Sequence, residues 1–157
     1  MAARKPLVLV NGRRQQLQAG DTLAASVTEN NTLTLTADAT LIAGQVVYPS
    51  AADHVNKAKA DAAGTVDAVG LAAAAVASSA TGAIQTSGVV TLSTAEWDAL
   101  AGTSGGLTFK TRYYLSAATA GLLTATPPSS VGQYVKEIGI AMSTTELLIT
   151  LMDETLL

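Results

Sequence analysis

The stretch Thr32-Leu33-Thr34-Leu35-Thr36 decides the fold class, because apolar and polar residues alternate at every position. Successive side chains of a β-strand point to opposite faces, so this alternation places both leucines on one face and the threonines on the other. The period of two predicts a half-buried strand. A second strand, Gln45 to Tyr48, ends at Pro49, whose nitrogen has no hydrogen to donate to a ladder.

Seven more strand candidates follow at close spacing, separated mostly by turns that contain Gly, Ser or Pro. They are His54 to Lys59, Val66 to Ala72, Ala83 to Leu92, Lys110 to Leu115, Gly121 to Ala125, Tyr134 to Met142 and Leu147 to Met152. This pattern predicts an all-β body, a small barrel or sandwich. We expect at most one short helix, at Thr94 to Leu100, where Ser93 or Thr94 caps the first turn and Glu96 complements the dipole.

Two of these segments share the pattern Val-x-x-aliphatic-Gly-aliphatic-Ala, at residues 66–72 and 135–141. Each follows a strand that contains an aromatic residue by a similar interval. We interpret the match as a structural repeat within one small barrel, with each Gly at a bulge or a close backbone approach. Chance similarity over seven positions is the alternative. The run Ala72 to Ala75 favours a helix by composition, but Gly70 and the valines around it favour a strand, which we expect.

The residues before the body form a separate unit. Leu7 to Val10 is a strand candidate, and Asn11-Gly12 suits the positive φ angles of a type I′ turn, so a hairpin returning from Arg13 to Leu17 is predicted. The polar segment that follows predicts a linker. The chain therefore divides into an N-terminal arm, residues 1–30, and a β-rich body, residues 31–157.

Composition limits the partners of the chain. Only 13% of the residues are charged, and a surface with few charges is poorly defended against association, so we expect a homo-oligomer. The net charge of −3 argues against nucleic acid as a partner. The apolar run Leu7 to Val10 is too short to span a bilayer, so no membrane is expected. Arg4, Lys5, Arg13 and Arg14 form either a solvated basic tail or a docking arm for an acidic surface.

The sequence contains few residues that could form a catalytic or ligand-binding site. His54 is the only histidine, so a Ser-His-Asp relay would need it, and we interpret it as a residue of an exposed strand. The acidic residues are scattered and no cysteine is present, so neither a metal site nor a cofactor is expected. The glycine-rich stretch 102–106 lacks the Gly-Lys-Ser/Thr of a phosphate loop, and we interpret it as a turn.

Three aromatic residues are candidates for an oligomer interface or a binding tip. They are Trp97, Tyr113 and Tyr114. We interpret Trp97 as a packing anchor in preference to a ligand platform. Adjacent residues of a strand point to opposite faces, so one of Tyr113 and Tyr114 is expected in the core and the other on the surface.

Several stretches carry a resemblance to a known class of proteins. Residues 7–12, followed by residues 15–23, resemble the short N-terminal segment of many tailed-phage virion proteins, although Arg13 and Arg14 occupy positions that are often less charged there. Residues 85–92, 113–116 and 131–143 are similar to the β-domains of phage decoration (cement) and head-fibre proteins. Together the matches cover most of the chain and contain no catalytic residues.

The resemblance implies a virion structural protein that decorates the outer capsid surface and stabilises the shell, favoured as a trimer. Its partners would be the major capsid protein and further copies of itself. As a hypothesis, the arm binds the capsid by strand addition. The expected capsid-binding residues are Leu7, Val8, Leu9, Val10, Arg13, Arg14 and Leu17.

Two alternatives stay open. The first is a head or tail fibre whose β-domain binds a receptor or glycan through exposed aromatic residues. The second is an enzyme, such as a β-barrel hydrolase, which would depend on His54. We expect a non-enzymatic protein, because no constellation of residues in the sequence supports catalysis.

Overall fold

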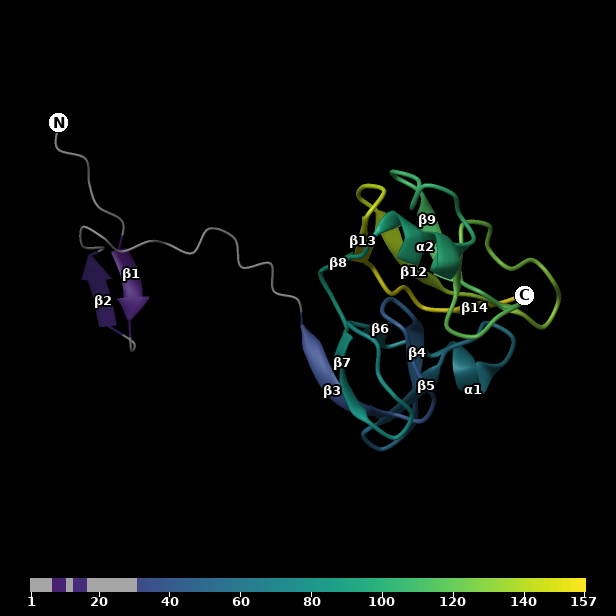
Figure 1. Cartoon of the computed structure of the whole chain (residues 1–157), viewed down its shortest axis with the longest axis horizontal. Helices are drawn as coiled ribbons and strands as arrows, with labels where there is room; N and C mark the ends of the chain where they lie inside the picture. The colour runs from purple at the N-terminus through teal and green to yellow at the C-terminus, as the bar shows by residue number, and fades with distance from the viewer. Residues whose placement is uncertain (1–6, 11–12, 17–30) are drawn as a thin grey trace.

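The computed structural model describes residues 7–10, 13–16 and 31–157. Strands dominate these residues and two short helices accompany them (Figure 1), so the expected all-β class is confirmed. The strands are β1 Leu7–Val10, β2 Arg13–Gln16, β3 Thr32–Ala37, β4 Val46–Ala51, β5 His54–Lys57, β6 Gly70–Ala72, β7 Thr81–Gln85, β8 Val89–Thr91, β9 Arg112–Leu115, β10 Leu123–Thr124, β11 Tyr134–Val135, β12 Glu137–Ala141, β13 Glu146–Ile149 and β14 Thr155–Leu156, and the helices are α1 Ala63–Val66 and α2 Thr94–Ala101.

The first unit of the body, residues 32–85, is a closed barrel with the strand order β3-β5-β4-β6-β7. Neighbouring strands are antiparallel except at one seam, where β3 and β5 run parallel with Thr36 opposite His54. The strand predicted from the alternation at residues 32–36 is therefore confirmed. The interior is small and aliphatic, which suits a chain with one Phe and one Trp. It consists of Ala37, Leu41, Val47, Val55, Ala72, Val76 and Ile84.

The second unit, residues 89–149, is an open five-stranded sheet with the order β10-β9-β12-β13-β8. It lies above the barrel in Figure 1, in green and yellow. The helix α2 connects β8 to β9 and contacts β10. A separate pair of short strands, β11 and β14, joins the C-terminal residues to this part of the body.

The two units have the same topology. In chain order, β3, β4, β5, β6 and β7 of the first unit correspond to β8, β9, β10, β12 and β13 of the second. The barrel order read from β5 is β5-β4-β6-β7-β3, and the corresponding strands give β10-β9-β12-β13-β8, which is the order of the open sheet. The four antiparallel pairings of the first unit all recur in the second. The parallel pairing does not, because β8 and β10 are unpaired with each other among the described strands. The body is thus a duplicated unit, closed in its first copy and open in its second.

The registers of the pairings agree residue by residue. Val47 lies opposite Gly70 in the barrel, and Tyr113 lies opposite Gly139 in the open sheet. The loop before the second strand agrees as well. The Gly44 amide donates to the carbonyl of Ala72 at 2.8 Å, and the Lys110 amide donates to the carbonyl of Ala141 at 2.9 Å. Gly44 and Lys110 also share a positive φ, of 81° and 64°.

The repeat expected from residues 66–72 and 135–141 is confirmed, but its expected place within one barrel is wrong. The two segments lie in different sheets at equivalent positions, in β6 and in β12. Their glycines serve the expected purpose. A Cβ on Gly70 would lie 2.4 Å from the carbonyl oxygen of Gln85, and a Cβ on Gly139 would lie 2.4 Å from that of Leu148.

The two units share one large core. The larger buried cluster contains Val46 and Leu71 from the first unit together with Trp97, Tyr113 and many others from the second. Because side chains alternate along a strand, β4 sends Val46 into this shared core and Val47 into the barrel interior. At the start of β4 both faces are buried, which explains why this part of the strand is a continuous apolar run without alternation.

Some predicted elements need correction. The expectation of at most one helix is wrong, because the body contains α1 as well as α2. The helix α1 ends at Val66, where the start of a strand was expected. The Thr65 hydroxyl donates to the carbonyls of Lys59 and Ala62 at 2.8 and 3.2 Å, which closes a single turn and buries Val66. The predicted strand over residues 83–92 is broken at Gly88, which has a φ of 87°. The expected helix is confirmed as α2, and Ser93 and Glu96 form its capping box.

Candidate functional site

The predicted hairpin at the N-terminus is present. β1 and β2 are antiparallel, with Leu7 opposite Gln16 and Val10 opposite Arg13. Six of the seven expected capsid-binding residues lie on these two strands, and Leu17 lies outside the described residues. Within the part of the chain that the structure describes, each strand pairs only with the other. Each therefore has one edge whose backbone groups have no strand partner, which is the arrangement that strand addition requires.

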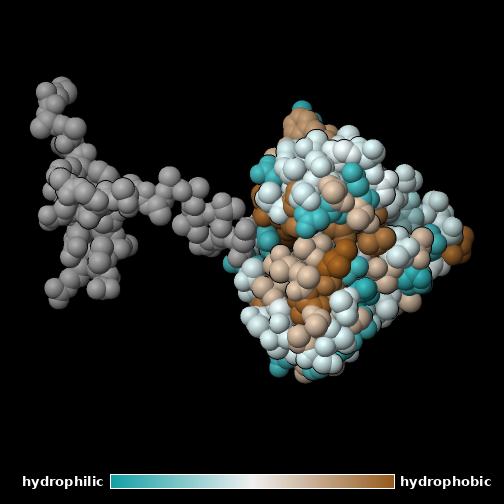
Figure 2. Space-filling model, in the orientation of Figure 1, coloured by the Kyte–Doolittle hydropathy of each residue, from teal (hydrophilic) through white to brown (hydrophobic). Residues whose placement is uncertain are grey.

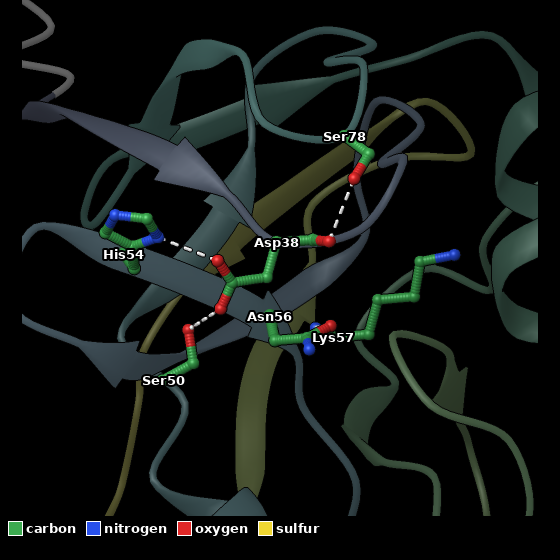
Figure 3. Close-up of polar contacts among 6 residues, drawn as sticks. All are labelled: Asp38, Ser50, His54, Asn56, Lys57 and Ser78. Atoms are coloured by element: carbon green, nitrogen blue, oxygen red, sulfur yellow. Dashed lines mark hydrogen bonds and ion pairs between the residues drawn. The ribbon is translucent and has the colours of Figure 1, made fainter.

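A polar cluster surrounds Asp38, just after the end of β3 (Figure 3). Its Oδ1 atom lies 2.7 Å from Nδ1 of His54, at the start of β5, and its Oδ2 atom accepts a hydrogen bond of 2.5 Å from the Ser50 hydroxyl. The Ser78 hydroxyl donates to the backbone carbonyl of Asp38 at 3.0 Å. Figure 3 shows Asn56 and Lys57 beside this cluster without a bond to it. Asp38 thus links β4, β5 and the segment before β7 to the end of β3.

The cluster contains the residue types of a catalytic triad in a different arrangement. In a triad the serine hydroxyl donates to the histidine, which removes its proton. Here the Ser50 hydroxyl donates to the carboxylate of Asp38. The hydrogen bond from Ser50, and next the one from His54, lower the pKa of Asp38 below its usual 3.8. The arrangement stabilises the ionised form of the Asp38 carboxylate and connects β3 to β5 where the barrel closes.

Two backbone amides of the glycine-rich stretch 102–106 donate hydrogen bonds to a side chain of the protein itself. The Asp98 carboxylate accepts hydrogen bonds from the amides of Gly105 and Gly106 at 3.0 and 2.8 Å and from the Thr103 hydroxyl at 2.9 Å. A phosphate loop needs free amides that point to an anion. In this loop the anion is the Asp98 carboxylate. The hydrogen bonds to it lower the pKa of Asp98, and the bond from the Gly106 amide has the largest effect. The turn predicted for this stretch is confirmed.

Two of the three aromatic candidates for an interface are buried. Trp97 and Tyr113 have no exposed surface, and each uses its polar atom inside the body. The Trp97 indole donates to the carbonyl of Thr145 at 2.9 Å, and the Tyr113 hydroxyl accepts from the amide of Thr108 at 3.0 Å. This burial argues against their assignment to an oligomer or tip interface and confirms the interpretation of Trp97 as a packing anchor. Tyr114 is half-buried on the opposite face, as the alternation required.

An apolar groove that was not predicted from the sequence lies between the two units. Figure 2 shows it as a brown and tan band across the front of the body, between the barrel and α2. The groove has a volume of about 890 Å³. It is lined by Ile42, Ala43, Ala73, Ala74, Ala75, Thr91, Leu92, Ser93, Glu96 and Thr145. The run of alanines was the available signal, because small exposed side chains leave a hollow beside larger neighbours.

The described residues contain no group of three or more His, Cys, Asp or Glu side chains that could hold a metal ion. None of the helices over residues 31–157 is long and apolar enough to cross a membrane.

The chain was compared with known proteins. No protein-family model matches it, and no curated protein matches its sequence.

Proposed function

We propose that the chain is a structural protein of a tailed-phage virion, which binds the outer capsid surface as a homotrimer and stabilises the shell. The attachment is made by residues 1–30 to the major capsid protein. The observation that carries the proposal is the hairpin, since β1 and β2 pair with each other and with no other described strand. An unpaired strand edge can add to an edge of another protein through backbone hydrogen bonds.

Charge adds a second contribution to this attachment. Arg13 and Arg14 lie on β2, while Arg4 and Lys5 are close in sequence, so a short segment carries four of the nine basic residues of a chain with a net charge of −3. An acidic capsid surface would attract such a segment. The attraction weakens as salt increases, because exposed charges are screened.

Oligomerisation strengthens an attachment that is weak for one chain. A single two-stranded hairpin has little stability alone, and one strand addition offers a small contact. When three chains are joined, binding of the first arm holds the other two close to their sites, which raises their effective concentration. The proposed trimer therefore binds a shell of repeated subunits more firmly than a monomer.

The fibre alternative is less well supported than attachment through the arm, because two of the three aromatic residues expected at a tip, Trp97 and Tyr113, lie in the core. The enzyme alternative required His54 to act on a nucleophile, whereas the nearby Ser50 hydroxyl donates to Asp38. We therefore propose a non-enzymatic function for the chain.

The test uses capsids from which accessory proteins have been removed. We expect the full chain to co-sediment with these capsids and to raise their temperature of disruption, and a chain lacking residues 1–30 to do neither. The variant Arg13→Glu should bind more weakly than the wild type, and its matched control, Lys57→Glu in the body, should bind normally. Equal binding of the full and truncated chains would overturn attachment through the arm, and no binding by either would overturn the proposed function.

A further inference from the structure

The duplication places a hollow and a projection at equivalent positions of the body. Gly44 and Lys110 are equivalent by backbone conformation and by hydrogen bonding, so Ala43 and Phe109, which precede them, are equivalent too. In the first unit Ala43 lines the apolar groove. In the second unit Phe109 projects from the surface with 58% of its area exposed.

A second pair of positions follows the same pattern. Ala72 and Ala141 are equivalent in β6 and β12, so the residues after them, Ala73 and Met142, are also equivalent. Ala73 lines the groove, and Met142 is 47% exposed. Large exposed apolar side chains thus stand in the second unit where alanines leave a groove in the first. An aromatic side chain on a surface is a common anchor of protein interfaces when a partner offers a pocket.

The charges of the two features are complementary. The Lys110 ammonium lies 5.1 Å from the centre of the Phe109 ring, so the projection carries a cation next to its apolar tip. The groove contains one carboxylate, Glu96. It accepts hydrogen bonds from the amide and hydroxyl of Ser93 at 2.8 and 2.6 Å, both at Oε2, and these bonds lower its pKa. Its other oxygen, Oε1, can accept a bond from an incoming ammonium group.

We propose that Phe109 and Lys110 of one copy of the chain bind in the groove of a second copy, with Phe109 against Ile42 and the alanines and Lys110 beside Glu96. The two surfaces that meet are different, so the contact is heterologous, and repeated contacts of this kind close into a ring when the rotation allows it. That the ring contains three copies rests on the proposed function. The contact itself does not depend on capsid binding.

The test is a complementation experiment in solution with full-length chains, followed by molar mass from analytical ultracentrifugation. Phe109→Ser removes the projection, and Ala74→Arg fills the groove and repels Lys110. We expect each variant to raise the dissociation constant of the oligomer at least about tenfold, so that monomers predominate at a protein concentration near the wild-type dissociation constant. An equal mixture of the two should form a dimer, because Phe109 of one variant meets the intact groove of the other, and the ring cannot close.

The matched control is Val131→Ser, which removes an apolar side chain that is 94% exposed and lies outside both surfaces. It should assemble as the wild type does. Circular dichroism will show that all variants are folded, since the altered side chains are exposed. A wild-type mass for Phe109→Ser, a monomeric mixture, or a monomeric wild type would each overturn this inference. Capsid binding through the arm is measured separately and can succeed while this inference fails.

Discussion

Asp38 and His54 are joined by a contact of 2.7 Å between Oδ1 and Nδ1, at the seam where β3 and β5 close the barrel. The parallel pairing of β3 and β5 is the one pairing of the first unit that the second lacks among its described strands. The contact therefore lies where the two units differ. It joins residues 16 positions apart in sequence across a parallel pairing, which hairpin geometry alone does not hold together.

We predict that Asp38→Asn lowers the melting temperature of the body and changes its dependence on pH. The hydrogen bonds from Ser50 and His54 lower the pKa of Asp38 below 3.8, so the ionised carboxylate stabilises the folded state. A lowered pKa gives a contribution that is complete above the ordinary value and is lost as the pH falls through the folded value. The difference between wild type and variant should thus be largest near neutral pH and vanish in acid.

Thermal unfolding followed by circular dichroism, from about pH 7 to about pH 2, checks this prediction. Asp153→Asn is the matched control, because Asp153 is exposed and distant in sequence from the seam. A difference that is the same at every pH would show that the charge of Asp38 does not stabilise the seam.

We predict that Gly70→Ala and Gly139→Ala destabilise the fold by similar amounts, about 1–3 kcal/mol each. In each case the new Cβ would lie 2.4 Å from a backbone carbonyl oxygen of the neighbouring strand, so the strands must separate. Similar losses are expected because the two glycines have equivalent registers in the two units.

Urea unfolding measures the losses, with Gly64→Ala as the control. A Cβ at Gly64 has nothing within 4 Å, so this variant should be as stable as the wild type or slightly more stable. If Gly70→Ala unfolded at the same urea concentration as Gly64→Ala, the close approach of β6 and β7 would not limit the side chain at this position.

Local patterns in the sequence predicted the elements that local forces determine. The alternation at residues 32–36 predicted β3, and Ser93 with Glu96 predicted the start of α2. The duplication was visible only at seven positions around Gly70 and Gly139, where neighbouring backbones exclude any side chain. Elsewhere the two units have the same strand register but different residues at equivalent positions, as at Val47 and Tyr113. A comparison of the two halves of the sequence therefore does not reveal the duplication there.

Features that depend on distant contacts could not be predicted. The seam pairs β3 with β5, although β4 lies between them in the sequence, and no periodicity indicates a parallel pairing of that kind. The contact of Asp38 with His54 depends on this closure, so the sequence places His54 in an exposed strand but does not indicate its partner. The groove is bounded by segments from both units, and only the packing of the units creates it.

We predict that Trp97→Ala destabilises the body by about 3–5 kcal/mol. Trp97 is completely buried in the shared core, and its indole donates to the carbonyl of Thr145 at 2.9 Å. The substitution leaves a cavity between α2 and the sheet and an acceptor without its donor. Met152→Ala, which shortens an exposed apolar side chain, is the control and should change stability by less than about 0.5 kcal/mol.

The same residue gives a direct optical measurement, because Trp97 is the only tryptophan of the chain. Its emission should be blue-shifted in the folded protein and move to longer wavelength in one step as urea unfolds the body. A red-shifted emission from the folded protein would place the indole in water and contradict the burial of Trp97.

The final prediction compares two adjacent tyrosines on β9. The Tyr113 hydroxyl is buried and accepts a hydrogen bond from the amide of Thr108 at 3.0 Å, so Tyr113→Phe leaves that amide without its acceptor. Because this bond is partly buried and Thr108 is exposed, its loss should cost about 0.5–1.5 kcal/mol. Tyr114 points to the opposite face and is half-buried, and Tyr114→Phe should change the free energy of unfolding by less than about 0.5 kcal/mol. Urea unfolding of both variants tests the difference. Because each variant loses one oxygen from the same residue type on the same strand, equal losses would mean that the bond to Thr108 contributes nothing, and a larger loss for Tyr114→Phe would reverse the assignment of the two faces.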